Sequence, residues 1–363
     1  YENVLVLDFK ALYTSMMRTF NIDPISFLKR NKEKNAVKAP NGVYFRNDNG
    51  IMPEIIKTLS EEREKVKKQD NQLASFAIKT VLNSFWGIFA NPSFRFFDMD
   101  LANAITNFGQ HIIKLTAKKI EEKGYEVIYS DTDSVFVDSK KKDEKEADNL
   151  GRKIEEEINE FYKEHIKKEY KRDSHLVLQF EKNYIRFLMP KTRSGEKGAK
   201  KRYAGLVRKD GIEKVETVGI EAVRTDWTEA AQIFQRELLD MIFHKKEIAS
   251  FIKTFVKDLQ EGNYDEQLLY RKQLRKELSA YTKITPQHVS AARKLGNEFT
   301  GNLIEYYVTT SGPEPKQALK HKLDYDHYIN KQIKPIAEMI LTFFNLNFDD
   351  IIKGSKQTKL FSY

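Results

Sequence analysis

Two aspartates separated by a single residue lie at the centre of residues 127–137, whose sequence is Val-Ile-Tyr-Ser-Asp-Thr-Asp-Ser-Val-Phe-Val. The apolar, β-branched runs on either side predict two buried strands joined by a tight turn. Side chains two apart in an extended chain point the same way, so Asp131 and Asp133 can approach one place. A divalent cation would offset their repulsion, and carboxylate oxygens suit Mg²⁺ or Mn²⁺. A hairpin turn with two solvated aspartates is the alternative.

A third carboxylate, Asp8, ends the first apolar run of the chain. If that strand ends beside the turn of Asp131 and Asp133, the three acids would form a site for two metal ions roughly 3.5–4 Å apart. Such a pair of ions stabilises both the attacking and the leaving oxygen in phosphoryl transfer. Asp8 could instead cap a helix, which is a common role of aspartate.

Two predicted helices each carry polar groups on one face. Lys79, Asn83 and Trp86 are spaced i, i+4 and i+7, so they share a face of one helix. Arg63 and Lys67 are spaced i, i+4 on the preceding helix. If the two faces converge, their cations could hold a triphosphate and the flat ring could lie against a base. Either face alone is more typical of a solvated helix surface.

A basic stretch with one aromatic ring follows later in the chain. Lys200, Lys201, Arg202 and Tyr203 are consecutive, and such a run could grip a nucleic-acid backbone. Basic runs are also common on solvated surfaces, so this stretch alone decides nothing.

The composition limits the class of protein. Lysine and arginine total 62 against 53 acids, a net charge of +9 that favours a polyanionic partner. The absence of cysteine excludes disulfides, thiol nucleophiles and cysteine zinc sites, and fits a reducing compartment. We expect no membrane partner, because no signal peptide opens the chain and no apolar run reads as long enough to span a bilayer. A length of 363 residues predicts two or three subdomains, and a start inside a strand suggests a piece of a longer protein or complex.

Three motifs occur in an order that resembles motifs A, B and C of the family B DNA polymerases. They are Asp-Phe-Lys-Ala-Leu-Tyr at 8–13, Lys79 with Asn-Ser-Phe-Trp-Gly at 83–87, and Tyr-Ser-Asp-Thr-Asp-Ser at 129–134. Residues 200–203 are similar to the family's primer-gripping motif, and residues 217–227 to the stretch that closes its palm. The likeness runs along essentially the whole chain. Chance agreement of several ordered motifs is far rarer than a single false match.

The resemblance implies an α+β fold of the right-hand polymerase type, with a mixed-sheet palm, helical-hairpin fingers and a mostly helical thumb. The expected parts are palm at 1–51, fingers at 52–90, palm at 91–227, thumb at 228–350 and a tail at 351–363.

The resemblance also implies roles for single residues. Asp8 and Asp133 would be the main metal ligands, with Asp131 nearby and the Phe9 carbonyl as a further oxygen. The nucleotide would be held by backbone N–H groups and side chains of Ala11, Leu12, Tyr13, Arg63, Lys67, Lys79, Asn83 and Trp86. Among these, Tyr13 would exclude a 2′-hydroxyl. DNA would be bound by Lys200, Lys201, Arg202, Tyr203 and Arg224.

Three positions depart from the family's pattern. Ala11 stands where serine is usual, Thr14 where proline is usual, and Trp86 where tyrosine is usual. The contact at Ala11 runs through the backbone, so we expect it to survive, whereas the bulk of Trp86 leaves nucleotide selectivity open.

The expected function is DNA-directed DNA synthesis from dNTPs on primer-template DNA, with two Mg²⁺ ions, or Mn²⁺ in their place, and without proofreading by this chain. The expected location is the cytoplasm, at the nucleoid. Gln357, Leu360 and Phe361 resemble a sliding-clamp-binding peptide; a frayed hydrophobic end is the alternative. The alternative function is a DNA-binding subunit that is inactive without a second chain carrying N-terminal and exonuclease domains. Reverse transcriptases fit less well, because they usually place two aspartates side by side and Thr132 separates them here.

Overall fold

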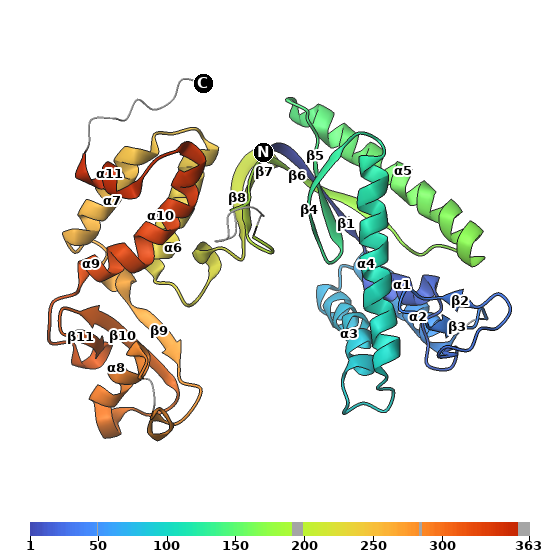
Figure 1. Ribbon diagram of the computed structural model, residues 1–363, viewed down its shortest axis with the longest axis horizontal. Coiled ribbons are helices and arrows are strands. Elements are labelled where there is room, and N and C mark those ends of the chain that lie inside the picture. The colour runs from blue at the N-terminus through green and yellow to red at the C-terminus, as the bar shows by residue number, and fades with distance from the viewer. Residues whose placement is uncertain (49, 191–198, 283–284, 355–363) are drawn as a thin grey trace. The chain divides into compact units, whose positions relative to one another are not determined.

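The computed structural model describes residues 1–48, 50–190, 199–282 and 285–354, and Figure 1 draws them as a coloured ribbon. The chain divides into two compact units, Tyr1–Arg186 and Phe187–Tyr363. The expected clamp-binding residues Gln357, Leu360 and Phe361 lie outside the described residues.

The first unit is built on an antiparallel sheet in the order β4-β5-β1-β6. Strand β5 is buried almost throughout and β1 over most of its length, as expected for runs rich in valine and leucine. The sequence pattern predicts the hairpin of β4 and β5, and this prediction is confirmed. The strands are β1 (Glu2–Phe9), β4 (Glu126–Asp131), β5 (Ser134–Asp138) and β6 (Leu178–Leu188).

Two long helices pack side by side against this sheet (Figure 1): α4 (Met99–Glu121) contacts β4 and β5, and α5 (Glu144–Tyr170) contacts β1. Each helix begins at an aspartate whose carboxylate accepts backbone N–H groups of the first turn. Asp98 accepts those of Asp100 and Leu101, and Asp143 accepts that of Glu146. The highly charged segment after β5 is therefore a capped amphipathic helix.

A short helix and a helical hairpin complete the first unit. Helix α1 (Leu12–Thr19) follows β1 directly and contacts α2, α3 and α4. Helices α2 (Ile51–Lys68) and α3 (Gln72–Ala90) pack against each other across a tight turn, as the sequence predicts for the fingers. A small hairpin of β2 (Val37–Lys38) and β3 (Tyr44–Phe45) lies between α1 and α2 in the chain.

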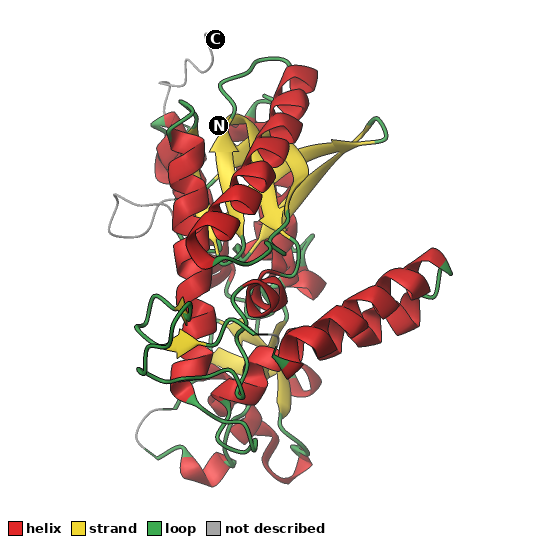
Figure 2. Cartoon of the chain, turned by 90° about the vertical axis from the view of Figure 1, so that its right-hand side faces the viewer, coloured by secondary structure: helices red, strands yellow, loops and turns green. Residues whose placement is uncertain are grey.

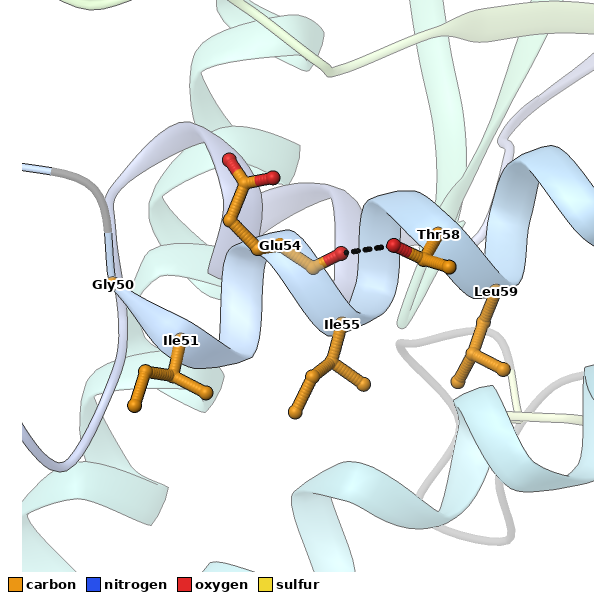
Figure 3. Close-up of a pocket in the computed structure, with 6 residues that line it drawn as sticks. All are labelled: Gly50, Ile51, Glu54, Ile55, Thr58 and Leu59. Carbon is orange, nitrogen blue, oxygen red and sulfur yellow. Dashed lines mark hydrogen bonds between the residues drawn. The ribbon is translucent and has the colours of Figure 1, made fainter.

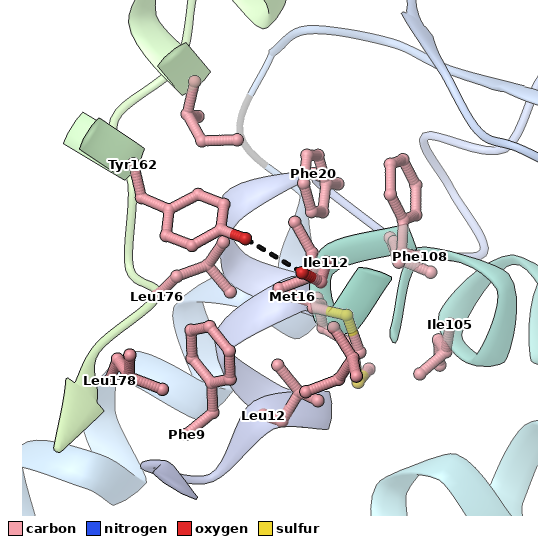
Figure 4. Close-up of a cluster of buried hydrophobic side chains, with 14 of the residues drawn as sticks. Phe9, Leu12, Met16, Phe20, Ile105, Phe108, Ile112, Tyr162, Leu176 and Leu178 are labelled. Carbon is pink, nitrogen blue, oxygen red and sulfur yellow. Dashed lines mark hydrogen bonds between the residues drawn. The ribbon is translucent and has the colours of Figure 1, made fainter. Parts of the chain in front are cut away.

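An aromatic core fixes the end of β1 and the start of α1 (Figure 4). The rings of Phe9 and Tyr162 meet edge to face with centroids 5.8 Å apart, and Phe20 stacks on Phe108 at 3.8 Å. The buried hydroxyl of Tyr162 donates to the Ile112 carbonyl at 2.9 Å. Because these large side chains come from β1, α4, α5 and the residue that follows α1, the packing holds β1 and α1 from several sides.

The second unit combines a hairpin, helices and a small sheet. Strands β9, β10 and β11 form an antiparallel sheet in the order β11-β10-β9, and α8 packs on β10 and β11. The strands are β7 (Tyr203–Lys209), β8 (Ile212–Val218), β9 (Tyr270–Gln273), β10 (Leu303–Thr309) and β11 (Gly312–Pro315). The α-helices are α6 (Glu229–Phe243), α7 (Ile248–Gln260), α8 (Gln287–Leu295), α9 (Tyr325–Tyr328), α10 (Lys334–Leu341) and α11 (Phe348–Lys353). Short helical turns of other kinds are η1 (Glu221–Val223), η2 (Asp265–Leu268), η3 (Leu278–Ala280), η4 (Gly296–Glu298), η5 (Lys316–Ala318), η6 (Ile329–Ile333) and η7 (Thr342–Phe344).

The architecture confirms an α+β chain in which helices predominate (Figure 2). Two details differ from the expectation. The strand pairs of the first unit are antiparallel, not mixed. The region after residue 228 contains the sheet of β9, β10 and β11. The helical periodicity of this region does not predict these short strands. The five-part division of the chain stays a prediction.

The expectation about membrane spans also needs correction. Within the described residues, α3 is long and apolar enough to cross a membrane when judged by length and composition alone. A single such helix is weak evidence. This one carries Lys79 and Asn83, begins at the cap Asn71, and packs against α2 and α4.

Candidate active site

Asp8 and Asp133 meet at the ends of paired strands. Asp8 lies opposite Ser134 in the register of β1 and β5, and the backbone N–H of Phe9 donates to the Asp133 carbonyl at 2.8 Å. Thr132, between the two aspartates, has φ of 42°, a left-handed conformation that is unusual for a β-branched residue. The tight turn thus places Asp133 beside Asp8.

The electrostatics of Asp8 differ from those of an ordinary surface acid. Burial raises the pKa of the Asp8 carboxyl to about 7, and the charges of Asp133 and Glu181 act in the same direction. Its side chain accepts no hydrogen bond from any residue that the structure describes. A cation bound here would relieve both the desolvation and the repulsion.

Glu181 is a charged neighbour of Asp8 that the sequence pattern does not predict. It lies in β6 where the register with β1 shifts: Val6 is opposite Lys182, whereas Leu7 is opposite Phe180. Glu181 is therefore the extra residue of a β-bulge, and bulges re-aim side chains beside active sites. The alternation of side chains along a strand cannot reveal a shift in register between two strands. The only signal in the sequence is an acidic residue, Glu181, within a partly apolar strand.

The two carboxylates of Asp8 and Asp133 suit a hard cation, although they are few donors for one. Asp8 and Asp133 supply carboxylate oxygens, which Mg²⁺ and Mn²⁺ prefer. In the part of the chain that the structure describes, no three histidine or acidic side chains gather closely enough to hold a metal ion. Asp131 therefore does not complete a three-carboxylate cluster as the chain stands, and its role stays a prediction.

The N-terminus of α1 lies directly after this strand end. Ala11 precedes the helix in a left-handed conformation, with φ of 49° and ψ of 53°, and no side chain caps the first turn. The backbone N–H groups of that turn therefore have no side-chain acceptor and could meet an anion. Leu12 is buried in the core, so its side chain cannot contact a ligand.

Tyr13 and Trp86 come together from different helices. Their ring centroids are 6.2 Å apart with a tilted arrangement, and Trp86 is 37% exposed. Lys79 and Asn83 are exposed on α3, as the spacing on one face predicts. The tyrosine and the tryptophan thus form one aromatic wall.

Arg63 and Lys67 have different surroundings. Lys67 pairs with Glu64 at 3.4 Å, and Lys10 pairs with the same oxygen at 3.5 Å. Arg63, together with Lys10 and Ala11, lines a cavity of about 190 Å³ beside α1. Three groups from motif A and the fingers therefore border one space.

A second hollow, of about 460 Å³, runs along one side of α2 (Figure 3). Ile51, Ile55 and Leu59 extend to one side of the helix there, while the Thr58 hydroxyl donates to the Glu54 carbonyl at 3.0 Å. This apolar lining does not suit a phosphate.

The basic stretch of the second unit is partly engaged. Lys200 and Lys201 are exposed, but the Arg202 guanidinium donates to the buried carboxylate of Glu221. A Cβ added at Gly219 would lie 2.0 Å from the Lys201 carbonyl, so this close approach requires glycine. Tyr203 packs against Phe187 with centroids 5.4 Å apart.

Arg224 is also held by a neighbour. Its guanidinium donates two hydrogen bonds to Asp226, at 3.0 and 2.8 Å. A DNA phosphate would have to compete with this carboxylate for Arg224.

Comparison with known proteins agrees with the motifs. The family model of DNA polymerase family B matches residues 1–343, and the chain belongs to this family. It is similar to DNA polymerase II of Escherichia coli strain K12, with 39% identity over 368 residues that cover 98% of this chain and 47% of that protein. It is also similar to a DNA polymerase of Thermococcus gorgonarius, with 30% identity over 97% of this chain and 46% of that protein.

A solved structure shares the fold. The family B DNA polymerase of the hyperthermophilic archaeon Pyrobaculum calidifontis matches all of this chain and 46% of that one, with a TM-score of 0.65 and 24% identity. The chain spans about half the length of the curated relatives it matches.

Proposed function

We propose that this chain is the synthetic part of a DNA-directed DNA polymerase. It would add a nucleotide from a dNTP to the 3′-hydroxyl of a primer, under the direction of a template strand. The primer oxygen attacks the α-phosphorus, the bond to the bridging oxygen breaks, and pyrophosphate leaves. The observation that carries the proposal is the meeting of Asp8 and Asp133 next to the uncapped N-terminus of α1.

Asp8 and Asp133 are the residues that would hold two Mg²⁺ ions, with the Phe9 carbonyl and Asp131 as further oxygens. Bound ions of this kind lower the pKa of an attacking hydroxyl and neutralise a triphosphate. Mn²⁺ prefers the same oxygen donors and could replace Mg²⁺.

The nucleotide would lie between α1 and the hairpin of α2 and α3. Backbone N–H groups at Ala11 and Leu12 would orient the triphosphate, and Tyr13 would lie under the sugar and exclude a 2′-hydroxyl. The tilted contact of Tyr13 with Trp86 supports a shared wall for sugar and base. The remaining groups, all from the fingers, would hold phosphates or shape the pocket: Arg63, Lys67, Lys79 and Asn83.

Primer-template DNA would be gripped in the second unit by the exposed Lys200 and Lys201, with Tyr203 beside them. Because Arg202 is paired with Glu221, we assign it the role of holding the stretch in place. Arg224 would contact DNA after breaking its hydrogen bonds with Asp226. A sliding clamp would bind Gln357, Leu360 and Phe361, and the protein would act in the cytoplasm, at the nucleoid.

Primer extension on a defined template tests this function. The wild-type chain should extend a labelled primer with Mg²⁺ and four dNTPs, and Asp133→Asn should not. Asp326→Asn, which removes an exposed carboxylate from the second unit, is the control and should extend normally. Normal extension by the Asp133 variant would contradict the mechanism.

A second candidate function is that of a DNA-binding subunit that is active only with a partner chain. Binding of primer-template without extension, and extension after a co-purifying partner is added, would favour this reading.

A further inference from the structure

The first turn of α2 is held by side chains from a distant part of the first unit. Gly50 precedes the helix and has no side chain to cap it, and Pro53 in the first turn has no N–H group. The Gly50 N–H donates to the Asn21 Oδ1 atom at 2.9 Å, and the Met52 N–H donates to the Asp23 Oδ2 atom at 2.7 Å. The first N–H groups of a helix need such acceptors. The cap of α2 therefore comes from the segment that follows α1, 29 residues earlier in the chain.

The carboxylate of Asp23 is fully buried and shared by several backbone groups. Its Oδ1 atom accepts the N–H groups of Ile25 and Ser26, at 2.7 and 3.1 Å, while its Oδ2 atom accepts that of Met52. Hydrogen bonds to a charged acceptor are stronger than neutral ones, and the dipole of a helix favours a negative charge at its N-terminus. Asp23 thus ties the start of α2 to residues 20–26.

Asn21 is buried beside it and has a left-handed backbone conformation, with φ of 54°, which asparagine tolerates better than most residues. Its amide nitrogen donates to the Ser26 hydroxyl at 2.9 Å and to the Arg46 carbonyl at 2.8 Å, while its oxygen accepts the Gly50 N–H. A buried amide with three partners has little freedom to move. We call the side chains of Asn21 and Asp23 the α2 anchor.

The α2 anchor leaves no room for a side chain at position 50. A Cβ atom added to Gly50 would lie 2.7 Å from the Asp23 Cβ and 3.0 Å from the Asn21 Oδ1. Asp23 could not move aside cheaply, because both of its oxygens accept hydrogen bonds. The backbone at Gly50 has φ of −82°, so glycine is required here by the space and not by the conformation.

The groups of α2 that are proposed to hold phosphates lie far from this anchor. Arg63 lies about 18 Å along the helix axis from the start of α2 at Ile51. A tilt of about 5° at the anchor would therefore displace Arg63 by about 1.5 Å. A displacement of about 1 Å in a group that orients a substrate can lower the rate about a hundredfold. Small changes at the start of the helix thus become large errors at its far end.

We propose that Asn21 and Asp23 are positioning residues for nucleotidyl transfer, because they fix the start of α2 and so set where Arg63 and Lys67 meet the triphosphate. The inference rests on the proposed function, which assigns phosphates to Arg63 and Lys67. Asp23 acts through α2 and touches neither the nucleotide nor a metal ion. A purely structural role would lower the stability of the fold but leave the dNTP kinetics of the folded protein unchanged.

Steady-state primer extension tests the proposal. Asp23→Asn keeps the size of the side chain but replaces one acceptor oxygen with a donor, so it should lower kcat/KM for dNTP at least about tenfold and leave the affinity for primer-template within about twofold. Asp143→Asn makes the same change at the cap of α5, a helix that carries none of the proposed nucleotide ligands, and should leave both unchanged. Equal kcat/KM values for the Asp23 and Asp143 variants, measured with equal amounts of folded protein, would overturn the proposal.

A double-mutant cycle shows whether Asp23 acts through Arg63. Once Arg63→Gln has removed the guanidinium, the tilt of α2 matters less, so Asp23→Asn in that background should lower kcat/KM by clearly less than it does alone. Losses that multiply in the double variant would show that the two residues act independently and would overturn the proposal.

A distance measurement tests the anchor without any enzyme assay. The chain has no cysteine, so Gln69→Cys at the end of α2 and Lys114→Cys on α4 supply the only two sites for thiol-reactive spin labels. The labelled chain should give one narrow distribution of label-to-label distances. Asp23→Asn should broaden or shift that distribution, because α2 then samples several tilts. A distribution that is unchanged in the folded Asp23 variant would overturn the proposal.

A second variant guards against misfolding. Gly50→Ala leaves both side chains of the α2 anchor in the chain but displaces Asp23, so it should change the distances and lower kcat/KM for dNTP as Asp23→Asn does. Melting temperatures show which variants fold, and a folded Gly50 variant with wild-type distances and kinetics would overturn the proposal. If the wild-type chain extends no primer but Asp23→Asn changes the distances, the placement of α2 by its anchor is supported and the proposed polymerase function fails.

Discussion

Two carboxyl groups, one in each unit, have pKa values that are shifted in opposite directions. Asp8 in the first unit is held beside Asp133 and Glu181, and burial raises its pKa to about 7. Glu314 in the second unit is more deeply buried, with 3% of its surface exposed, yet its pKa falls to about 2. Burial opposes that fall. It is outweighed by the backbone N–H groups of Lys320 and His321, at 2.8 and 3.1 Å, and by the His321 ring at 2.6 Å.

The difference separates a carboxylate that stabilises the fold from one that we propose to bind metal ions. Glu314 ties β11 to the segment after it, and its acceptors are satisfied within the unit. Asp8 accepts no hydrogen bond from the described residues and is repelled by Asp133 and Glu181, so a cation bound beside it would stabilise its charged form. A buried acid therefore has to be judged by its partners and not by its burial.

The largest expected effect is on catalysis by the Asp8 site. If Asp8 binds metal ions as proposed, Asp8→Asn should lower primer extension at least about a thousandfold, because the variant loses several kcal/mol of transition-state stabilisation. Glu314→Gln should keep most of its activity per folded molecule. Single-turnover extension with matched amounts of folded protein measures both. Equal losses in the two variants would erase the proposed difference between the carboxylates.

A smaller effect is expected on the stability of the second unit. Glu314→Gln should lower the free energy of unfolding by about 2 kcal/mol, because a buried, charge-assisted hydrogen-bond network is lost. Since the folded pKa lies below the ordinary value of 4.5, this stability is present above pH 4.5 and is lost as the pH falls toward 2. Urea titrations at pH 7 and pH 3 measure the difference, which should shrink at the lower pH.

The control for this prediction is Glu298→Gln, which neutralises an exposed glutamate in the same unit and should be nearly neutral. A Glu314 variant as stable as the Glu298 variant at pH 7 would show that the network contributes little.

The sequence predicts those parts of the site that are encoded by local spacing. The hairpin that carries Asp131 and Asp133, the strand that ends at Asp8, and the pairing of α2 with α3 all follow from periodicity and turn residues. The proximity of Tyr13 and Trp86 follows from the resemblance to the family and not from spacing, because it depends on how α1 packs on α3.

Other features depend on register and on distant partners. The bulge at Glu181 arises because β1 and β6 slip by one residue, which no single strand encodes. Arg202, which the sequence predicts to bind DNA, forms an ion pair with Glu221 instead. Gln235 also donates a hydrogen bond to Glu221, at 2.9 Å. Charge counts along the chain cannot show which cations are already paired.

The smallest expected effect is on the stability of the first unit. In EDTA, Asp8→Asn should raise the free energy of unfolding at pH 8 by about 1 kcal/mol, an amount that allows for solvent screening of a half-buried group. The folded pKa of about 7 lies above the ordinary value of 3.8, so the contribution of Asp8 to stability is complete below pH 3.8 and is lost as the pH rises through 7. The gain should therefore vanish near pH 4.

Urea titrations at pH 8 and pH 4 measure this gain, with Asp326→Asn as the control. Mg²⁺ should stabilise the wild-type chain more than the variant. If Asp8→Asn is less stable than the wild type at pH 8 in EDTA, Asp8 behaves like Glu314, and the strain attributed to its charge does not exist.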